Sequence, residues 1–405
     1  MKGVILAAGP GEELKPITDS ISKPMIPILD KPMIQYAIER LSSNGITNLI
    51  IVIKEGNKEI PDYFSNGEDF GVRITYVSQK QDGIDGAILS VQKYFKENEK
   101  FVLTHCDIIA NPNLVTRTLN AADNLGSDMA LAVTLESEIQ DFGLVTLNSE
   151  GLVERVIPEI DTGTGNYVVA GTFLLTAKIF TYLEKGIAFN ECFNSFIKDG
   201  GLVAAGVWNE TWFDIGRAWD IIRANSYLLN KLTHSKISKN ARIEHNVEIK
   251  GAVIIEDGAQ ILNGSTIQGP VYIGKNAFIG NNSLIRDCSV ISEDAKIGMG
   301  VEVKNSVIMK GASIARLSYV GASIIGPKAT LHSGAITIIS KKPFAPITTV
   351  IQGKEITVPL EKFGSIVGPH SHVGEHSSLH PGTRIDSYAI VPPNKAVSGH
   401  IKAED

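Results

Sequence analysis

The chain has 405 residues, 43% of them hydrophobic and 20% charged, which is ordinary for a soluble globular protein and long enough for two domains. A net charge of −6 argues against nucleic-acid binding, because no basic excess is available to neutralise a phosphate backbone. No apolar run reaches membrane-spanning length, and no basic segment leads into an apolar stretch at the N-terminus. The three cysteines are too widely spaced for a disulfide framework, so we expect a reducing, cytoplasmic location.

The first segment combines a buried strand with a glycine loop. Residues 2–7 are mostly apolar, as expected of a buried parallel strand, and Ala8 leads into Gly9-Pro10-Gly11. Glycines at this point let the backbone approach a ligand closely and leave amide N–H groups free to bind phosphate. Lys23, which precedes Pro24, adds a movable positive charge suited to the same phosphates.

Residues 1–225 alternate between strand-like and helix-like stretches, which predicts a doubly wound α/β domain. We expect strands over 2–7, 47–53, 73–78, 101–105 and 129–135, and helices over 31–43, 84–95 and 113–125. Ligands of such sheets bind beyond the carboxyl ends of the strands. Asp107 follows the strand 101–105 and is therefore expected to present its carboxylate at that edge.

The second half of the chain has a six-residue period, and it predicts a left-handed parallel β-helix over residues 237–405, joined to the first domain by a linker over 226–236. The period slips around 312–322 and is lost over about 339–362, where lysines and prolines indicate a loop that carries function or contacts a neighbouring subunit. The repeating aliphatic positions are Ile237, Ile243, Ile249, Ile255, Ile261, Ile267, Ile273, Ile279, Ile285, Ile291, Ile297, Val303 and Met309, followed by Val367, Val373, Leu379, Ile385, Val391 and Val397.

The opening segment, from Leu6-Ala7-Ala8-Gly9 to Lys23-Pro24, resembles the signature of sugar-1-phosphate nucleotidylyltransferases. Together with the β-helix, nearly the whole chain resembles the archaeal type of bifunctional N-acetylglucosamine-1-phosphate uridylyltransferase/glucosamine-1-phosphate acetyltransferase. The resemblance implies that a nucleoside triphosphate and a sugar 1-phosphate react to an NDP-sugar and pyrophosphate. It also implies a homotrimer formed through the β-helix. The sequence identifies neither the sugar nor the base.

The resemblance assigns roles to residues of this chain. It implies that Lys23, Asp107 and Asp214 are catalytic, and that the two aspartates hold Mg²⁺ against the triphosphate. Asp214 stands in Trp212-Phe213-Asp214-Ile215-Gly216, which fits the second carboxylate motif. The implied nucleotide-binding residues are Ala8, Gly9, Gly11, Gln79 and Gly86, and the implied sugar-binding residues are Gly143 and Gly171. For Gly86, a helix start with Asp85 as its cap is an equally good interpretation.

Several positions depart from the pattern of the resembling enzymes. Glu13 replaces an arginine that faces the triphosphate, Glu159 falls where a lysine contacts the sugar phosphate, and Val169 replaces a sugar-binding asparagine. Lost phosphate cations cost transition-state stabilisation. An alternative hypothesis is therefore a catalytically degenerate subunit that binds nucleotide sugar and regulates an active paralogue.

A second alternative is a CoA-dependent sugar acyltransferase on the β-helix, with acetyl-CoA as cosubstrate. The segment around Tyr319, with Lys341 and Lys342 further on, resembles that site, but Arg316 stands where the histidine base is expected. A guanidinium stays protonated, so acetylation by the usual mechanism is not expected. The histidines at 370, 372, 376 and 380 are expected to face solvent rather than to bind zinc, because residues four apart lie on different faces of a six-residue repeat.

Overall fold

The computed structural model describes residues 1–135, 143–157, 167–341 and 345–403. They form two compact units, each of which is discontinuous in sequence. Unit 1 consists of Met1–Pro10, Lys23–Met25 and Pro32–Asp214, and unit 2 of Gly11–Ser22, Ile26–Lys31 and Ile215–Asp405. A single boundary near residue 225 therefore does not describe this division, since two short N-terminal segments group with the second half of the chain.

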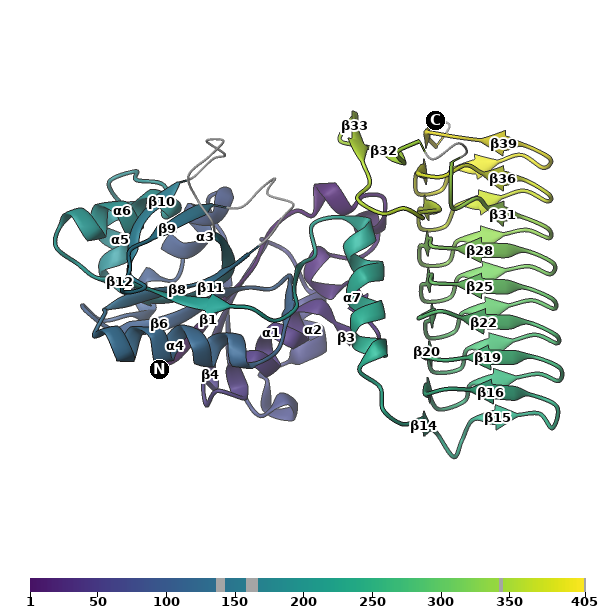
Figure 1. The fold of residues 1–405 in the computed structure, drawn as a ribbon, viewed down its shortest axis with the longest axis horizontal. Coiled ribbons are helices and arrows are strands. Elements are labelled where there is room, and N and C mark those ends of the chain that lie inside the picture. Colours follow the sequence, from purple (N-terminus) through teal and green to yellow (C-terminus); the bar gives the residue numbers. More distant parts are fainter. Residues whose placement is uncertain (136–142, 158–166, 342–344, 404–405) are drawn as a thin grey trace. The chain divides into compact units, whose positions relative to one another are not determined.

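A nine-stranded mixed sheet is the centre of unit 1 (Figure 1). Its strands are β1 (Lys2–Ala7), β4 (Asn48–Ile53), β5 (Arg73–Ser78), β6 (Lys100–His105), β8 (Met129–Thr134), β9 (Leu144–Leu147), β10 (Val153–Ile157), β11 (Tyr167–Thr176) and β12 (Val203–Trp208). The order is β10-β9-β11-β6-β1-β4-β5, and β8 pairs with both β11 and β12. β1 is parallel to β4 and β6, whereas β11 is antiparallel to β6 and β8.

Helices cover both faces of this sheet, which confirms the predicted α/β class. Along β1 the side chains alternate, so that Val4 packs into one core and Ile5 into the other. The Ile5 core includes α1 (Met33–Ser42), α2 (Glu59–Phe64) and α4 (Asn113–Leu125), and the Val4 core includes α3 (Gly83–Leu89), α5 (Lys178–Leu183) and α6 (Phe189–Lys198). The remaining short elements are β2 (Pro27–Ile28), β3 (Lys31–Pro32) and the 3-10 turns Glu12–Leu14, Ile17–Asp19, Lys23–Met25, Glu68–Phe70 and Gln92–Tyr94.

The predicted helix over 84–95 is shorter than expected. It ends at Leu89, and only a 3-10 turn follows. The Ser90 hydroxyl donates to the carbonyl of Ala87 at 2.6 Å. Such local side-chain bonds compete with continuation of a helix, and a pattern of apolar residues does not reveal them.

Unit 2 contains three long parallel sheets that form a β-helix (Figure 1). Its strands are β14 (Lys236–Ile237), β15 (Arg242–Ile243), β16 (Glu248–Lys250), β17 (Val253–Ile255), β18 (Gln260–Ile261), β19 (Thr266–Gln268), β20 (Val271–Ile273), β21 (Phe278–Ile279), β22 (Leu284–Arg286), β23 (Val290–Ile291), β24 (Lys296–Ile297), β25 (Glu302–Lys304), β26 (Val307–Ile308), β27 (Ser313–Ile314), β28 (Tyr319–Gly321), β29 (Ile324–Ile325), β30 (Thr330–Leu331), β31 (Ile336–Thr337), β34 (Ser365–Val367), β35 (His372–Val373), β36 (Ser378–Leu379), β37 (Thr383–Ile385), β38 (Ile390–Val391), β39 (Ala396–Val397) and β40 (His400–Ile401).

Most of the predicted repeat positions line the β-helix interior, but two predictions were wrong: Ile237, in the first strand, is exposed, and Met309 does not belong to the interior cluster. Ile273 pairs with Ile291, a full coil later, whereas Ile291 pairs with Ile308. One residue is therefore missing between Val303 and Ile308, earlier than the predicted slip. A second shortened face lies between Val320 and Ile325. Ile308 belongs to the interior cluster, whereas Met309 is buried outside it. Because both residues are apolar, the sequence pattern was compatible with either of them pointing inward.

The predicted loop after Ile339 is an excursion from the β-helix, because Ile325 pairs across it with Val367. Its described part carries an antiparallel hairpin of β32 (Thr348–Ile351) and β33 (Lys354–Thr357). The Arg384 guanidinium of β37 (Thr383–Ile385) donates to the Val350 carbonyl of this hairpin at 3.2 Å.

Helix α7 (Ala218–Asn230) begins unit 2's continuous part and extends into the expected linker. The side chain of Asn225 accepts a hydrogen bond from the Leu29 amide at 2.7 Å, which ties one of the N-terminal segments to this helix. In its first turn the Asp220 carboxylate accepts from the Arg217 amide at 2.8 Å. Burial nevertheless raises the pKa of Asp220 to about 6.

Replacing Asp220 by asparagine is expected to stabilise the protein at neutral pH. A carboxyl whose folded pKa lies above its unfolded value binds more protons when folded, so the free energy of unfolding falls as pH rises from about 4 to about 6. Asparagine keeps an acceptor for the Arg217 amide without the buried charge. We expect a gain of up to about 3 kcal/mol at pH 7.5 that shrinks toward pH 4. Thermal melts of both proteins across this range measure it, and a constant difference would contradict it.

Candidate functional site

Two carboxylates meet at the carboxyl end of β6. This strand is apolar from Phe101 to Leu103, and the run Thr104-His105-Cys106-Asp107 follows. Immediately afterwards β7 (Ile108–Ala110) pairs antiparallel with β13 (Trp212–Asp214), and Asp214 lies opposite Ile108. Asp214 therefore pairs with the residue that directly follows Asp107, although more than one hundred residues separate the two aspartates in sequence.

Lys23 joins this pair of carboxylates. Its Nζ lies 2.5 Å from Asp107 Oδ2, and each side chain is only 16% exposed. Burial alone would lower the pKa of Lys23, but Asp107 and Asp214 outweigh it and raise that pKa above its ordinary value. Burial would likewise raise the pKa of Asp107, and Lys23 is the main cause of its being lowered instead. Both side chains are charged at neutral pH.

The arrangement fits Mg²⁺. The second oxygen of Asp107, Oδ1, is buried and has no hydrogen-bond partner among the described residues. Such an atom is costly unless a ligand satisfies it. Within the described ranges, no cluster of three or more histidine, cysteine or acidic side chains could hold a metal by itself. Mg²⁺ commonly binds through one or two carboxylates and completes its shell with water and substrate phosphates, so the two aspartates suffice.

The glycine loop divides between the two units. In unit 1, Ala8 packs against the Val4 core and Gly9 follows, exposed. A Cβ added to Gly9 would meet no described atom within 4 Å, and its φ is not in the left-handed region. The fold thus does not require glycine at position 9. In unit 2, Gly11 has a φ of 68°, and its carbonyl accepts from the Thr18 hydroxyl at 2.8 Å, so this glycine does have a conformational reason.

Gln79 and Gly86 order one loop at the end of β5. The Gln79 amide donates to the carbonyls of Gln81 and Gly83 at 2.5 and 2.7 Å. A Cβ on Gly86 would lie 2.2 Å from the Gln81 carbonyl oxygen, which requires glycine there. Asp85 does not cap this helix; it lies inside α3 and accepts from the Phe189 amide at 3.0 Å. The structure therefore brings Gln79 and Gly86, two of the predicted nucleotide-binding residues, to one loop. Contacts within this loop also give each residue a structural reason.

Of the predicted sugar-binding glycines, Gly171 lies within β11 and Gly143 lies beside it. Gly171 has a φ of 66°, and a Cβ there would be 3.0 Å from Ile108, the residue after Asp107. The Gly143 carbonyl accepts from the Val169 amide at 3.0 Å. Gly171 is thus adjacent to the Asp107 segment, and Gly143 is adjacent to Val169, which is nearly buried in the Val4 core. Glu159 and the aromatic residue before Gly143 lie outside the described residues.

Three residues near these segments were not anticipated from the sequence. Arg40 and His105 belong to unit 1; burial lowers the pKa of His105, and its Nε2 is buried with no partner among the described residues. In unit 2, Arg217 pairs with Glu13 at 2.8 Å, so the acid that replaces the expected arginine has a cation beside it. His105 could have been found from the sequence, because it is a polar residue at the end of a mostly apolar strand. No sequence pattern indicates a role for Arg40 or Arg217.

Of the acyltransferase-like residues, Tyr319 and Lys341 lie in the described part of unit 2. The Tyr319 hydroxyl lies over Gly321 and close to Ile339, two residues before Lys341. Lys341 donates to the Thr348 hydroxyl at 3.5 Å. Lys342 lies outside the described residues. Arg316 is an exposed corner residue. Among the histidines, His372, His376 and His380 are exposed, and the rings of His332 and His372 are 5.7 Å apart.

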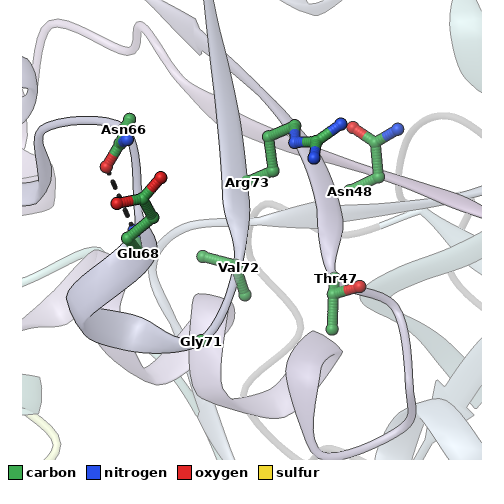
Figure 2. A pocket seen from close by; sticks show the side chains of 7 residues that line it. All are labelled: Thr47, Asn48, Asn66, Glu68, Gly71, Val72 and Arg73. Atoms are coloured by element: carbon green, nitrogen blue, oxygen red, sulfur yellow. Dashed lines mark hydrogen bonds between the residues drawn. The ribbon is translucent and has the colours of Figure 1, made fainter.

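A cavity of about 700 Å³ lies at the opposite ends of the strands from Asp107 (Figure 2). Asn48 and Arg73, which begin β4 and β5, line it together with Thr47, Asn66, Glu68, Gly71 and Val72. The side chain of Asn66 accepts from the Glu68 amide at its rim. None of the predicted site residues lines this cavity, so the candidate site is defined by Lys23, Asp107 and Asp214 rather than by this cavity.

Comparison with known proteins identifies the class to which this fold and site belong. Residues 2–231 match the nucleotidyl transferase family, and residues 267–404 match the GMPPB C-terminal domain. The chain belongs to the nucleotidyl transferase family, which confirms the resemblance seen in the sequence.

Curated relatives match over almost the full length. A bifunctional sugar-1-phosphate nucleotidylyltransferase/acetyltransferase from Sulfurisphaera tokodaii is 35% identical over 98% of this chain and 97% of the relative. The bifunctional protein GlmU of Methanocaldococcus jannaschii is 33% identical over 96% and 92%. Among solved structures, the UDP-glucose pyrophosphorylase of Acinetobacter baumanii is similar in fold, with a TM-score of 0.51 and 21% identity over 57% of this chain and 94% of that chain. No described helix is both long and apolar enough to span a membrane.

Proposed function

We propose that this protein transfers a nucleotidyl group from a nucleoside triphosphate to a sugar 1-phosphate. The observation that carries the proposal is the state of Asp107: one buried oxygen pairs with Lys23, and the other has no partner among the described residues. Asp214 pairs with Ile108, the residue that follows Asp107. An unsatisfied carboxylate oxygen beside a second carboxylate and a lysine suits a metal-bound triphosphate.

In the proposed reaction an oxygen of the sugar phosphate attacks the α-phosphorus, and the bond from that phosphorus to the bridging oxygen breaks. Pyrophosphate leaves with the electron pair, and the sugar phosphate becomes part of an NDP-sugar. Mg²⁺ bound by Asp107 and Asp214 would neutralise charge on the phosphates. Lys23 supplies a mobile cation that can move from Asp107 to the triphosphate. No described atom lies within 4 Å of a Cβ added to Gly9, which leaves room for a phosphate oxygen to approach the backbone there.

Pyrophosphate release tests this function. The purified protein with Mg²⁺ is offered each nucleoside triphosphate and dTTP against a panel of hexose and hexosamine 1-phosphates. We expect turnover for at least one pair, and its loss in the Asp214→Asn protein. A protein that binds nucleotide sugar but is silent across the panel would overturn the proposal in favour of a regulatory subunit of an active paralogue, the interpretation that the Glu13–Arg217 pair and the apolar Val169 favour.

Gly9→Ala separates ligand binding from folding. Because the added methyl group meets no described atom, we expect the melting temperature to stay within about 2 °C of the wild type. The KM for the triphosphate is expected to rise at least about tenfold, since a Cβ would obstruct the approach of phosphate to the backbone. Steady-state kinetics and thermal melts measure both effects. An unchanged KM would show that the ligand does not approach this glycine.

The relatives' names also include acetyl transfer, which we do not extend to this chain, because exposed Arg316 cannot act as a base. Acetyl-CoA serves as the check: a rise in melting temperature on its addition would reveal a CoA site. We further propose a homotrimer formed through the β-helix, which light scattering tests. Three free cysteines agree with the proposed cytoplasmic location.

A further inference from the structure

Arg40 is a buried cation beneath the candidate site. It lies on α1 in unit 1 and is only 1% exposed. One guanidinium nitrogen donates to the carbonyl of Ile108 at 2.8 Å, and the other donates to the hydroxyl of Thr104 at 2.9 Å. Nε has no hydrogen-bond partner among the described residues. The bonds of this side chain thus reach only neutral acceptors.

Burying a charged guanidinium in this way destabilises the folded state. Among the described residues, the hydrogen-bond partners of Arg40 are the Ile108 carbonyl and the Thr104 hydroxyl and include no carboxylate. Removing a guanidinium from water without an ion partner costs several kcal/mol. Burial lowers the pKa of Arg40 to about 10, partly offset by the more distant charge of Asp107, so the side chain still carries its charge at neutral pH. An apolar residue of similar volume would satisfy the packing alone. A role beyond packing is needed to explain an arginine here.

The two groups that Arg40 binds lie on either side of Asp107. Thr104 and Ile108 are the first and last residues of the five-residue segment that contains it. The Thr104 hydroxyl also lies 3.1 Å from that of Thr172 and 3.2 Å from the Gly171 carbonyl. The indole of Trp212 donates to the neighbouring Ala170 carbonyl at 3.1 Å. One buried network therefore connects the Asp107 segment, the β11 bend at Gly171 and the strand that carries Asp214.

We propose that Arg40 is a positioning residue for nucleotidyl transfer, which fixes the Thr104–Ile108 segment so that Asp107 presents its unpartnered oxygen to a divalent cation. The inference rests on the proposed function and deepens its metal site. Arg40 does not touch the substrate in this role. It acts through the Thr104 hydroxyl on one side of Asp107 and the Ile108 carbonyl on the other, and its charge further favours the ionised carboxylate.

Arg40→Met tests the proposal, with Arg40→Lys as the conservative variant and Arg73→Met, an exposed arginine of unit 1, as the matched control. Mn²⁺ binding to the protein is measured by electron paramagnetic resonance, together with kcat, KM and the melting temperature. We expect Arg40→Met to fold, to bind Mn²⁺ about tenfold more weakly and to lose about 10- to 100-fold in kcat with little change in the KM for sugar phosphate. Arg40→Lys should recover part of the Mn²⁺ affinity, and the control should match the wild type.

A lower melting temperature with unchanged Mn²⁺ affinity and kcat would overturn the proposal and leave Arg40 a structural residue. If Arg40→Met does not fold, Thr104→Val is the second test, because it removes one hydrogen-bond acceptor of Arg40 at nearly constant side-chain volume. Undiminished Mn²⁺ affinity of the Thr104→Val protein would also overturn the positioning role of Arg40. Because Mn²⁺ binding needs no turnover, a wild type that binds the metal without releasing pyrophosphate would refute the proposed function alone.

Discussion

Replacing Asp107 by asparagine is expected to lower kcat/KM by roughly 10³-fold or more. The amide cannot supply the negative charge that a bound Mg²⁺ requires, and the metal contributes several kcal/mol of charge stabilisation, each 1.4 kcal/mol being tenfold in rate. The change also leaves the buried Lys23 ammonium without its close partner at 2.5 Å. Pyrophosphate release, measured over a range of Mg²⁺ concentrations, checks the loss and shows whether excess metal restores any rate.

Asp128→Asn is the matched control, because Asp128 belongs to the same unit and pairs with a lysine, Lys100, at 3.6 Å, but its side chain is 60% exposed. It should retain wild-type turnover. A melting temperature recorded for both variants separates loss of chemistry from loss of fold. An Asp107→Asn protein that is folded and still within tenfold of wild-type activity would rule out Asp107 as a metal ligand.

The fold could be predicted from sequence where the signal is periodic. The six-residue repeat placed the β-helix interior because each face needs one inward aliphatic side chain, and Thr337 shows how the interior tolerates an exception: its hydroxyl accepts from the Gly321 amide at 2.8 Å. The register error at Met309 arose where Ile308 and Met309 are both apolar and buried. Periodicity alone cannot choose between two such neighbours.

The grouping of the N-terminal segments with unit 2 could not be predicted. It depends on bonds between distant residues, such as that from the Ser387 hydroxyl to the Asp19 carboxylate at 2.7 Å and that between Leu29 and Asn225. Nothing in residues 11–22 by themselves indicates that a coil near the end of the chain will contact them. Contacts of this kind follow from the finished topology rather than from local sequence.

At the candidate site, the strand-end pattern predicted Asp107, and the resemblance to sugar-1-phosphate nucleotidylyltransferases predicted Asp214. The pattern could not give their environment. Arg40 stands between Ile38 and Leu41 near the end of a helix, where a basic residue ordinarily faces solvent and interacts with the helix dipole. Its burial against Thr104 became visible only when β6 and α1 were packed together. The sequence therefore did not predict Arg40, to which we assign a positioning role.

Lys23→Met is expected to affect both stability and rate. Without Lys23, Asp107 becomes a buried charge lacking its ion partner, a change that typically costs 3–5 kcal/mol, and burial would then raise the pKa of Asp107. Divalent cations should compensate, so 10 mM Mg²⁺ is expected to raise the melting temperature of the variant more than that of the wild type, in which the metal competes with Lys23. The lost phosphate cation should lower kcat by about 10²- to 10³-fold.

The sign of the pH dependence provides an independent check. In the wild type the lowered pKa of Asp107 contributes stability above the unfolded pKa of about 4, and this contribution is lost as pH falls. In Lys23→Met, protonation of Asp107 removes the unpaired buried charge and stabilises the folded protein. The difference in the free energy of unfolding between wild type and variant should therefore become smaller in acid. Lys100→Met, at a lysine that is 39% exposed, should show neither effect. If Mg²⁺ raises the melting temperatures of the variant and the wild type equally, Lys23 does not compete with the metal for Asp107. That result would contradict the proposal that Lys23 moves from Asp107 to the triphosphate.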